Sequence, residues 1–303
     1  MTRQRTLKTA FERSGSGLHT GRTCTVRVLP AAANTGIRFR RVDLPAQPEV
    51  PAHIEWLHST DRSTNLARGA ARVHTVEHLL SALAAARVDN ALIEIDGMEV
   101  PILDGSAQPF VGGIETREQD AERNVWVLSE SVVYDNGRGV RLEAHPAAAL
   151  TLESTIDFGQ PPIGRQTATL NCLDDFGDDI SRARTFCFLD EIELLYDHGL
   201  IRGGDLTNAV VFVRKEMPES EVRRIAQKIG KPDLRVRNSG TLTNTELRYP
   251  NEPARHKLLD LLGDLTLLGQ PLRARIVATR PGHAANAAFT RLLYDQTTKR
   301  PQS

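Results

Sequence analysis

The chain has 303 residues, which at roughly 100–200 residues per domain suggests two domains. Its composition, 40% hydrophobic and 25% charged, is ordinary for a globular protein. Lys plus Arg equals Asp plus Glu, at 38 each, so the chain has no overall basic field to attract nucleic acid. We therefore expect no nucleic-acid partner.

The chain gives no sign of membrane insertion or secretion. No apolar run approaches the ~20 residues of a membrane-spanning helix, and no apolar stretch follows the basic first ten residues. The three cysteines, Cys24, Cys172 and Cys187, form no C-x-x-C pair, which predicts free buried thiols in a reducing compartment. We expect a cytoplasmic protein in which cysteine holds no metal.

Apolar periodicity predicts a mixture of strands and helices. In chain order, we expect a strand over residues 23–29, a helix over 75–86, strands over 91–95, 125–128, 140–144 and 150–156, a helix over 190–197, a strand over 209–213, helices over 219–229 and 255–268, a strand over 274–278, and a helix over 284–294. The polar stretch 115–124 predicts a boundary between domains 1–120 and 125–303. Strands precede the longer helices on each side, which favours an α+β fold.

The first candidate site is the run His74-Thr75-Val76-Glu77-His78, which fits the H-x-x-E-H pattern of inverzincin metallopeptidases. That pattern needs both histidines on one helix face. Thr75 is a good N-cap, so His74 would precede the helix. We interpret His78 as a metal ligand and Glu77 as a base, with His74 packing or hydrogen-bonding nearby.

The second candidate is a polar stripe on the helix 255–268. His256, Asp260 and Asp264 are four residues apart and share one face, while the leucines gather on the opposite face. A solvated polar face would explain a single carboxylate. The full spacing is also what a helix would use to supply two metal ligands and a supporting acid.

The third candidate is His283, which follows a strand and a Pro-Gly turn and begins a helix. Such junctions commonly project side chains into a cleft. Two histidines and one aspartate would complete an open catalytic zinc site with water in the fourth position. Glu77 and His283 would then supply acid–base groups for amide hydrolysis.

These motifs, with several others, resemble the UDP-3-O-acyl-N-acetylglucosamine deacetylases of lipid A synthesis. The matching blocks lie in the family's order: Gly17-Leu18-His19-Thr20-Gly21, Thr75-Val76-Glu77-His78-Leu79, Val100 to Ser106, Ser181-Arg182-Ala183-Arg184-Thr185-Phe186, Arg255-His256-Lys257 with Gly263-Asp264, and Gly282-His283-Ala284. They run from near residue 5 to near residue 290. Six blocks in order are far more specific than any one of them.

The resemblance implies a fold and a set of roles. It implies two two-layer α/β sandwich domains whose helical layers pack face to face, with the active site at their junction. By the same match, Zn²⁺ would be held by His78, His256 and Asp260. Glu77 would act as general base, His283 as the protonated group that protonates the leaving amine, Asp264 as its orienting partner, and Thr185 as a hydrogen-bond donor to the tetrahedral intermediate.

The resemblance also predicts the substrate contacts. The substrate would be a UDP-sugar carrying a fatty acyl chain, with Lys257, Phe158 and Arg280 meeting the UDP part. Phe186 and Gly204 would also contact substrate, and an insert at about 190–213 would form the acyl passage.

One stretch departs from the common family pattern. Residues 214–253 are longer than in many members and resemble the version fused to a hydroxyacyl-carrier-protein dehydratase. Whether the chain was separated from such a dehydratase or stands alone is left open by the sequence. We expect a monomer.

Two other functions stay open on the residues themselves. A metallopeptidase using His74, Glu77 and His78 would lose its metal when His74 is removed. A non-catalytic module that binds sugar nucleotides or lipids would hold no metal. The ligand set His₂Asp also suits Fe²⁺ or Co²⁺.

Overall fold

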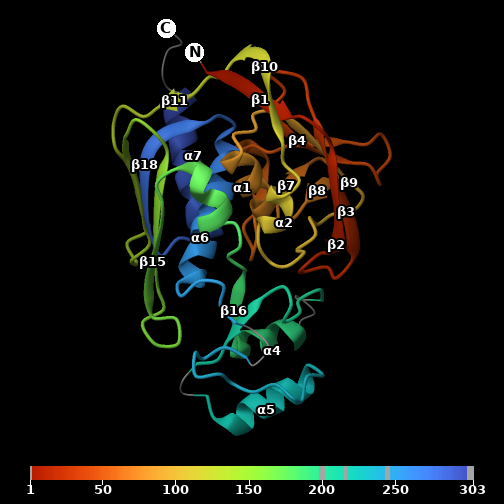
Figure 1. Cartoon of the computed structure of the whole chain (residues 1–303), viewed down its shortest axis with the longest axis vertical. Helices are drawn as coiled ribbons and strands as arrows, with labels where there is room; N and C mark the ends of the chain where they lie inside the picture. The colour runs from red at the N-terminus through yellow and green to blue at the C-terminus, as the bar shows by residue number, and fades with distance from the viewer. Residues whose placement is uncertain (1, 198–201, 215–216, 243–245, 299–303) are drawn as a thin grey trace.

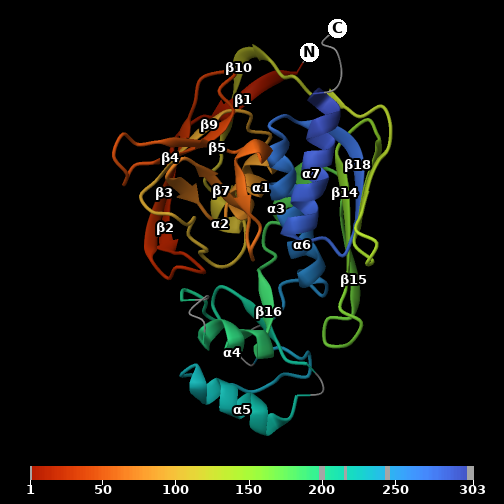
Figure 2. The same cartoon turned by 180° about the vertical axis from the view of Figure 1, so that it is seen from behind.

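The computed structural model describes residues 2–197, 202–214, 217–242 and 246–298. Two sheets form the outer layers of the main body, and helices from both halves lie between them (Figures 1 and 2). Buried apolar side chains of both sheets and of these helices form one continuous core. The predicted α+β class, with helical layers face to face, is confirmed; the division into domains 1–120 and 125–303 stays a prediction.

The first half is built on a sheet from residues 11–95. Among the described residues its order is β2 (Phe11–Ser16), β3 (Thr23–Pro30), β9 (Ala91–Ile95), β4 (Ile37–Arg41) and β5 (Glu49–Pro51). A smaller sheet and three helices also belong to this half: β6 (Leu57–Ser59), β7 (Asn65–Arg68), β8 (Ala71–Val73), η1 (Ile54–Trp56), α1 (Glu77–Ala85) and α2 (Gln108–Val111). Cys24, Val26 and Val28 are buried on one face of β3, as their alternation predicts.

The second half is built on a sheet from residues 126–279. Its strands run in the order β12 (Val132–Asp135), β13 (Arg141–Pro146), β18 (Leu272–Thr279), β14 (Thr151–Asp157) and β15 (Arg165–Leu170), with β11 (Trp126–Val127) also pairing with β18. Its helices are η2 (Leu173–Asp175), α3 (Phe176–Asp179), α6 (Glu252–Leu265), η3 (Thr266–Leu268) and α7 (His283–Thr298). The helix predicted over 255–268 thus ends in a 3-10 turn.

The polar stretch 115–124 contains a strand, which the sequence did not predict. β10 (Thr116–Glu122) pairs antiparallel with β1 (Arg3–Leu7). Cross-strand charges accompany this pairing, with Arg5 Nη2 lying 3.9 Å from Glu118 Oε1. Because no side chain of β10 is buried, its composition resembles that of a loop.

Residues 186–242, as far as they are described, form what we call the outer lobe, below the main body in Figure 1. It contains β16 (Phe186–Phe188), α4 (Leu189–Asp197), β17 (Val210–Phe212) and α5 (Glu219–Lys228). A separate small apolar cluster joins α4 and α5 through residues such as Ile192, Val222 and Ile225. Part of the insert predicted at 190–213, residues 198–201, lies outside the described residues.

Helices α1 and α6 approach very closely. A β-carbon added at Gly263 would lie 2.2 Å from the carbonyl oxygen of Glu77, so only glycine fits there. The predicted leucine face of α6 is buried, and the stripe of His256, Asp260 and Asp264 is also buried. This packing brings the polar stripe of α6 against the start of α1.

The cysteines are less buried than the sequence predicts. All three cysteines are free, but only Cys24 is buried; Cys172 and Cys187 are half-buried, so the prediction of buried thiols was wrong for those two. No helix in the described part of the chain is long and apolar enough to cross a membrane.

Candidate metal centre

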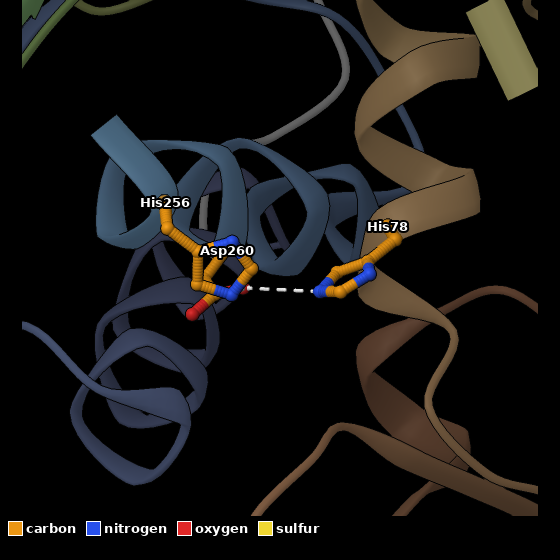
Figure 3. A group of neighbouring side chains, drawn as sticks. All are labelled: His78, His256 and Asp260. Atoms are coloured by element: carbon orange, nitrogen blue, oxygen red, sulfur yellow. Dashed lines mark ion pairs between the residues drawn. The ribbon is translucent and has the colours of Figure 1, made fainter. Parts of the chain in front are cut away.

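Three side chains that the sequence analysis singled out meet between α1 and α6. His78, His256 and Asp260 each offer a ligand atom, and these atoms all lie within 4.8 Å of one another. Figure 3 shows His78 reaching from α1 toward His256 and Asp260 on α6. The two imidazole rings are 5.0 Å apart and perpendicular. The three residues are buried, at 4%, 2% and 1% exposure, which excludes a solvated polar face.

The hydrogen bonds of this trio leave ligand atoms available for a metal ion. Nδ1 of His256 lies 3.1 Å from the carbonyl oxygen of Ala183 and can donate to it, which leaves the Nε2 lone pair facing Asp260. Oδ2 of Asp260 accepts a 2.7 Å hydrogen bond from Lys257. Oδ1 of Asp260 is buried without any hydrogen-bond partner among the described residues. A buried, unpartnered carboxylate oxygen facing two imidazoles is a donor set for a divalent cation.

The electrostatics of the trio favour the protonation states that bind metals. Burial, aided by His256, lowers the pKa of His78 to about 3, and burial also lowers the pKa of His256. Burial raises the pKa of Asp260, but His256 and Lys257 outweigh it and the net pKa is lowered. Two neutral imidazoles and one carboxylate are the forms that coordinate a metal.

Glu77 stands beside this trio as a carboxylate with a raised pKa. Burial is the main cause, and it raises the pKa of Glu77 to about 7 despite the opposing charge of His283. Its Oε1 lies 3.7 Å from Nε2 of His283, and its Oε2 accepts a 3.0 Å hydrogen bond from the amide of Thr64. A pKa near neutrality suits a group that takes up and returns a proton.

His283, the first residue of α7, lies among the carboxylates of Glu77, Asp260 and Asp264. Its Nδ1 lies 3.0 Å from Oδ2 of Asp264. Burial alone lowers the pKa of His283, but Asp264, Asp260 and Glu77 raise it to about 9. The raised pKa favours a protonated imidazole, which lies opposite the Glu77 carboxylate and beside that of Asp264.

Thr64 connects these groups and was missed by the sequence analysis. Its hydroxyl donates to Oδ1 of Asp264 at 2.5 Å and lies 3.2 Å from Nδ1 of His283. Its amide donates to Glu77, and its carbonyl accepts from the amide of Val76 at 3.2 Å. A lone threonine beside β7 carries no local motif, so only the folded arrangement reveals its position.

Asn286 is a second residue that the sequence analysis did not assign. Its side-chain amide donates a 2.9 Å hydrogen bond to Oδ2 of Asp264, one turn along α7 from His283. The i, i+3 spacing from His283 is the signal that would have found it.

Two predicted substrate residues, Lys257 and Phe186, lie next to the trio, and a third, Phe158, lies behind Phe186. The rings of Phe186 and His256 are 6.3 Å apart, and Phe158 packs against Phe186 at 5.9 Å. The ammonium group of Lys257 lies 5.7 Å from the centre of the Phe186 ring. Phe158 is 41% exposed, so part of its ring is free to meet a ligand.

Thr185, Gly204 and Arg280 are the other predicted contact residues. Thr185 is half-buried, and its amide donates to the carbonyl of Gly105 at 2.8 Å. Gly204 is exposed in the outer lobe. Arg280 is exposed after β18, with its guanidinium near Gly139. Their roles toward substrate stay predictions.

The structure corrects one detail of the H-x-x-E-H interpretation. Thr75 is not the N-cap of α1; Val76 is, and the backbone of Thr75 is left-handed with φ of 57°. The physical reason is that the Thr75 hydroxyl bonds to Glu99 instead of capping the helix. His74 precedes α1, in a backbone bridge with Glu99, so it shares no helix face with His78.

The chain matches the family of UDP-3-O-acyl N-acetylglycosamine deacetylases over residues 4–229 and 233–295. The chain belongs to this family. The resemblance drawn from the sequence motifs is thereby confirmed.

Among similar members of the deacetylase family is the bifunctional enzyme LpxC/FabZ of Chlorobaculum tepidum, 43% identical over 297 residues. That match covers 96% of this chain but 64% of the relative, so the chain spans just under two thirds of that protein's length. A UDP-3-O-acyl-N-acetylglucosamine deacetylase of Thermosynechococcus vestitus is 41% identical, with 97% of this chain and 95% of the relative covered. One from an Anaeromyxobacter species is 40% identical, with 95% and 87% covered.

Proposed function

We propose that this protein hydrolyses the acetamide of UDP-3-O-(3-hydroxyacyl)-N-acetylglucosamine, giving the free amine and acetate. The observation that carries the proposal is the buried trio of His78, His256 and Asp260, flanked by a carboxylate and a protonated imidazole. Family membership supports the same activity. The protein would then act in the committed step of lipid A biosynthesis in the cytoplasm of a Gram-negative bacterium.

The residues around the trio suit a nucleotide sugar with an acyl chain. Lys257 supplies a positive charge beside the centre, and Phe158 offers an exposed ring face. Apolar side chains of the outer lobe would line the path of the fatty acyl group. Arg280 and Gly204 complete the proposed contacts.

His78, His256 and Asp260 would hold the metal, and zinc is the ion that we propose, with Fe²⁺ as an alternative for the same ligands. When bound, such an ion acts as a Lewis acid on a carbonyl and makes water more acidic. The remaining steps fall to the side chains of this chain.

Glu77 would act as the general base. Its pKa of about 7 leaves a substantial carboxylate fraction at neutral pH, ready to accept a proton from the attacking water. The hydrogen bond from the Thr64 amide fixes one oxygen and leaves Oε1 directed at His283. The base is therefore held in one orientation before substrate arrives.

His283 would act as the general acid. With a pKa of about 9 it carries a proton at neutral pH, which it would deliver to the leaving amine nitrogen. Before that, its charge would stabilise the negative oxygen of the tetrahedral intermediate. Thr185 would donate a further hydrogen bond to that intermediate.

Acetate release from the acylated UDP-sugar tests the proposal directly. We expect the purified protein to release one acetate per free amine, to lose activity with a chelator and to regain it with Zn²⁺. UDP-N-acetylglucosamine without the acyl chain is the matched control and should react far more slowly. A protein that binds Zn²⁺ but releases no acetate from the acylated substrate would contradict the proposed function.

A further inference from the structure

Glu99 is a buried carboxylate outside the metal centre, and hydrogen-bond donors fill both of its oxygens. Its exposure is 1%. Oε1 accepts from the amide of His19 at 2.9 Å and from the hydroxyl of Thr75 at 3.2 Å. Oε2 accepts from the amide and hydroxyl of Thr20 at 2.8 Å and 2.7 Å. One side chain thus ties two separate segments together.

The first of these segments contains Thr75 and leads into α1. Thr75 adopts φ of 57°, a left-handed conformation that is rare for a β-branched residue and persists only when its surroundings hold it. Glu99 holds its hydroxyl, and Asn65 accepts from its amide at 3.3 Å. Glu77 follows two residues later and His78 three, so the conformation of Thr75 sets where both side chains point.

The second segment is the loop 17–22, on which the outer lobe rests. Gly203 donates its amide to the carbonyl of Leu18 at 3.1 Å. A β-carbon at Gly203 would lie 2.0 Å from the carbonyl oxygen of Gly17, and one at Gly17 would lie 2.3 Å from Oε2 of Glu99. Glu99, the loop 17–22 and Gly203 of the outer lobe are therefore in contact, with no room for a side chain between them.

We propose that Glu99 is a positioning residue that fixes the start of α1 and the loop 17–22, which contacts the outer lobe, relative to each other. This inference rests on the proposed deacetylase function, because it joins the base Glu77 to the lobe that would hold the acyl chain. Only a carboxylate fits the site. Each oxygen accepts a hydrogen bond from a backbone N–H, which can only donate. A carboxamide in either orientation would place its NH₂ group, also a donor, against one of these N–H groups.

The central experiment replaces Glu99 with glutamine in the metal-loaded protein. We expect Glu99→Gln to lower kcat by about 10-fold, the lower end of the range for groups bonded directly to metal ligands, because Glu99 acts on His78 through Thr75. Glu99→Gln should also weaken the affinity for Co²⁺, measured against a chelator, because the conformation of Thr75 sets the position of the ligand His78. The Co²⁺ measurement needs no substrate.

Two matched pairs of variants test separately the hydrogen bonds of Glu99 to Thr75 and to Thr20. Thr75→Val removes the hydroxyl toward α1 and should lower kcat and Co²⁺ affinity with little change in KM, whereas Thr75→Ser keeps the hydroxyl and should restore both. Thr20→Val removes the hydroxyl toward the loop and should raise KM for the acylated substrate more than it lowers kcat, while Thr20→Ser should not. If Glu99→Gln does not fold, the Thr75 pair carries the test.

The possible failures are distinguishable. Wild-type kcat and Co²⁺ affinity in both Glu99→Gln and Thr75→Val would overturn the proposal, as would equal losses in Thr75→Ser and Thr75→Val. The deacetylase function would be refuted if the wild type binds Co²⁺ but releases no acetate. The positioning role would still be supported if Co²⁺ binding is then weaker in Glu99→Gln and Thr75→Val but not in Thr75→Ser.

Discussion

The metal centre and the outer lobe both depend on charged side chains, but they use them differently. In the centre, Thr64 bonds to Asp264 across 200 positions of sequence, and both residues are buried. In the outer lobe, Arg224 pairs with Glu193 and Glu221 at the surface of α5 and α4, where Arg224 is half exposed. Buried groups depend on each other because water cannot replace a lost partner, whereas exposed pairs are screened. Single changes should therefore be severe in the centre and mild in the lobe.

The largest expected effect is the loss of Glu77, the proposed base. Glu77→Gln keeps the size of the side chain and removes its ability to accept a proton. We expect kcat to fall by roughly 10²- to 10⁴-fold, as for other general bases, while metal content stays at the wild-type level. Steady-state kinetics and metal analysis measure the two quantities, and near-wild-type turnover would show that another group takes the proton.

A large structural effect is expected where α1 and α6 touch. Gly263→Ala would place a β-carbon 2.2 Å from the Glu77 carbonyl oxygen, so the helices must move apart. We expect a loss of about 1–3 kcal/mol in the free energy of unfolding, typical of overpacking, and reduced turnover. Gly177→Ala is the control, because its β-carbon would meet nothing within 4 Å. Equal unfolding curves for the two variants in denaturant would contradict this close packing.

A pH-dependent effect is expected from Asp264→Asn. Asp264 is the first of the charges that raise the pKa of His283 from 6.5 to about 9 against the effect of burial. Its neutralisation should lower that pKa, measured by NMR titration of the imidazole in the metal-free protein. Because a raised histidine pKa stabilises the fold at low pH, the stability lost in the variant should be greatest below pH 6.5 and vanish as pH rises through about 9. An unchanged His283 titration would show that Asp264 does not hold its charge.

The smallest effect is expected in the outer lobe. Arg224→Ala removes exposed ion pairs to Glu193 and Glu221 and should leave metal content and turnover close to wild type. Any change in thermal unfolding should shrink as salt is added. A loss of turnover comparable with that of Glu77→Gln would mean that α5 and the metal centre are tightly coupled.

Local spacing was enough to predict much of the centre but not the groups that support it. His256, Asp260 and Asp264 repeat every four residues, so one helix face had to carry all three. Thr64 bonds to Glu77 and Asp264, and Glu99 bonds to Thr75 just before α1, through tertiary contacts that no spacing along the chain reveals. The strand β10 was missed for a related reason, because pairing with β1 stabilises it rather than an apolar face of its own.

Metal content of the wild type and two variants tests the central claim most directly. We predict about one metal ion per chain in the wild type and in His74→Ala, because His74 lies outside α1. Asp260→Ala should lose the ion, since Oδ1 of Asp260 faces both imidazoles. A metal that is lost in His74→Ala and retained in Asp260→Ala would contradict the account.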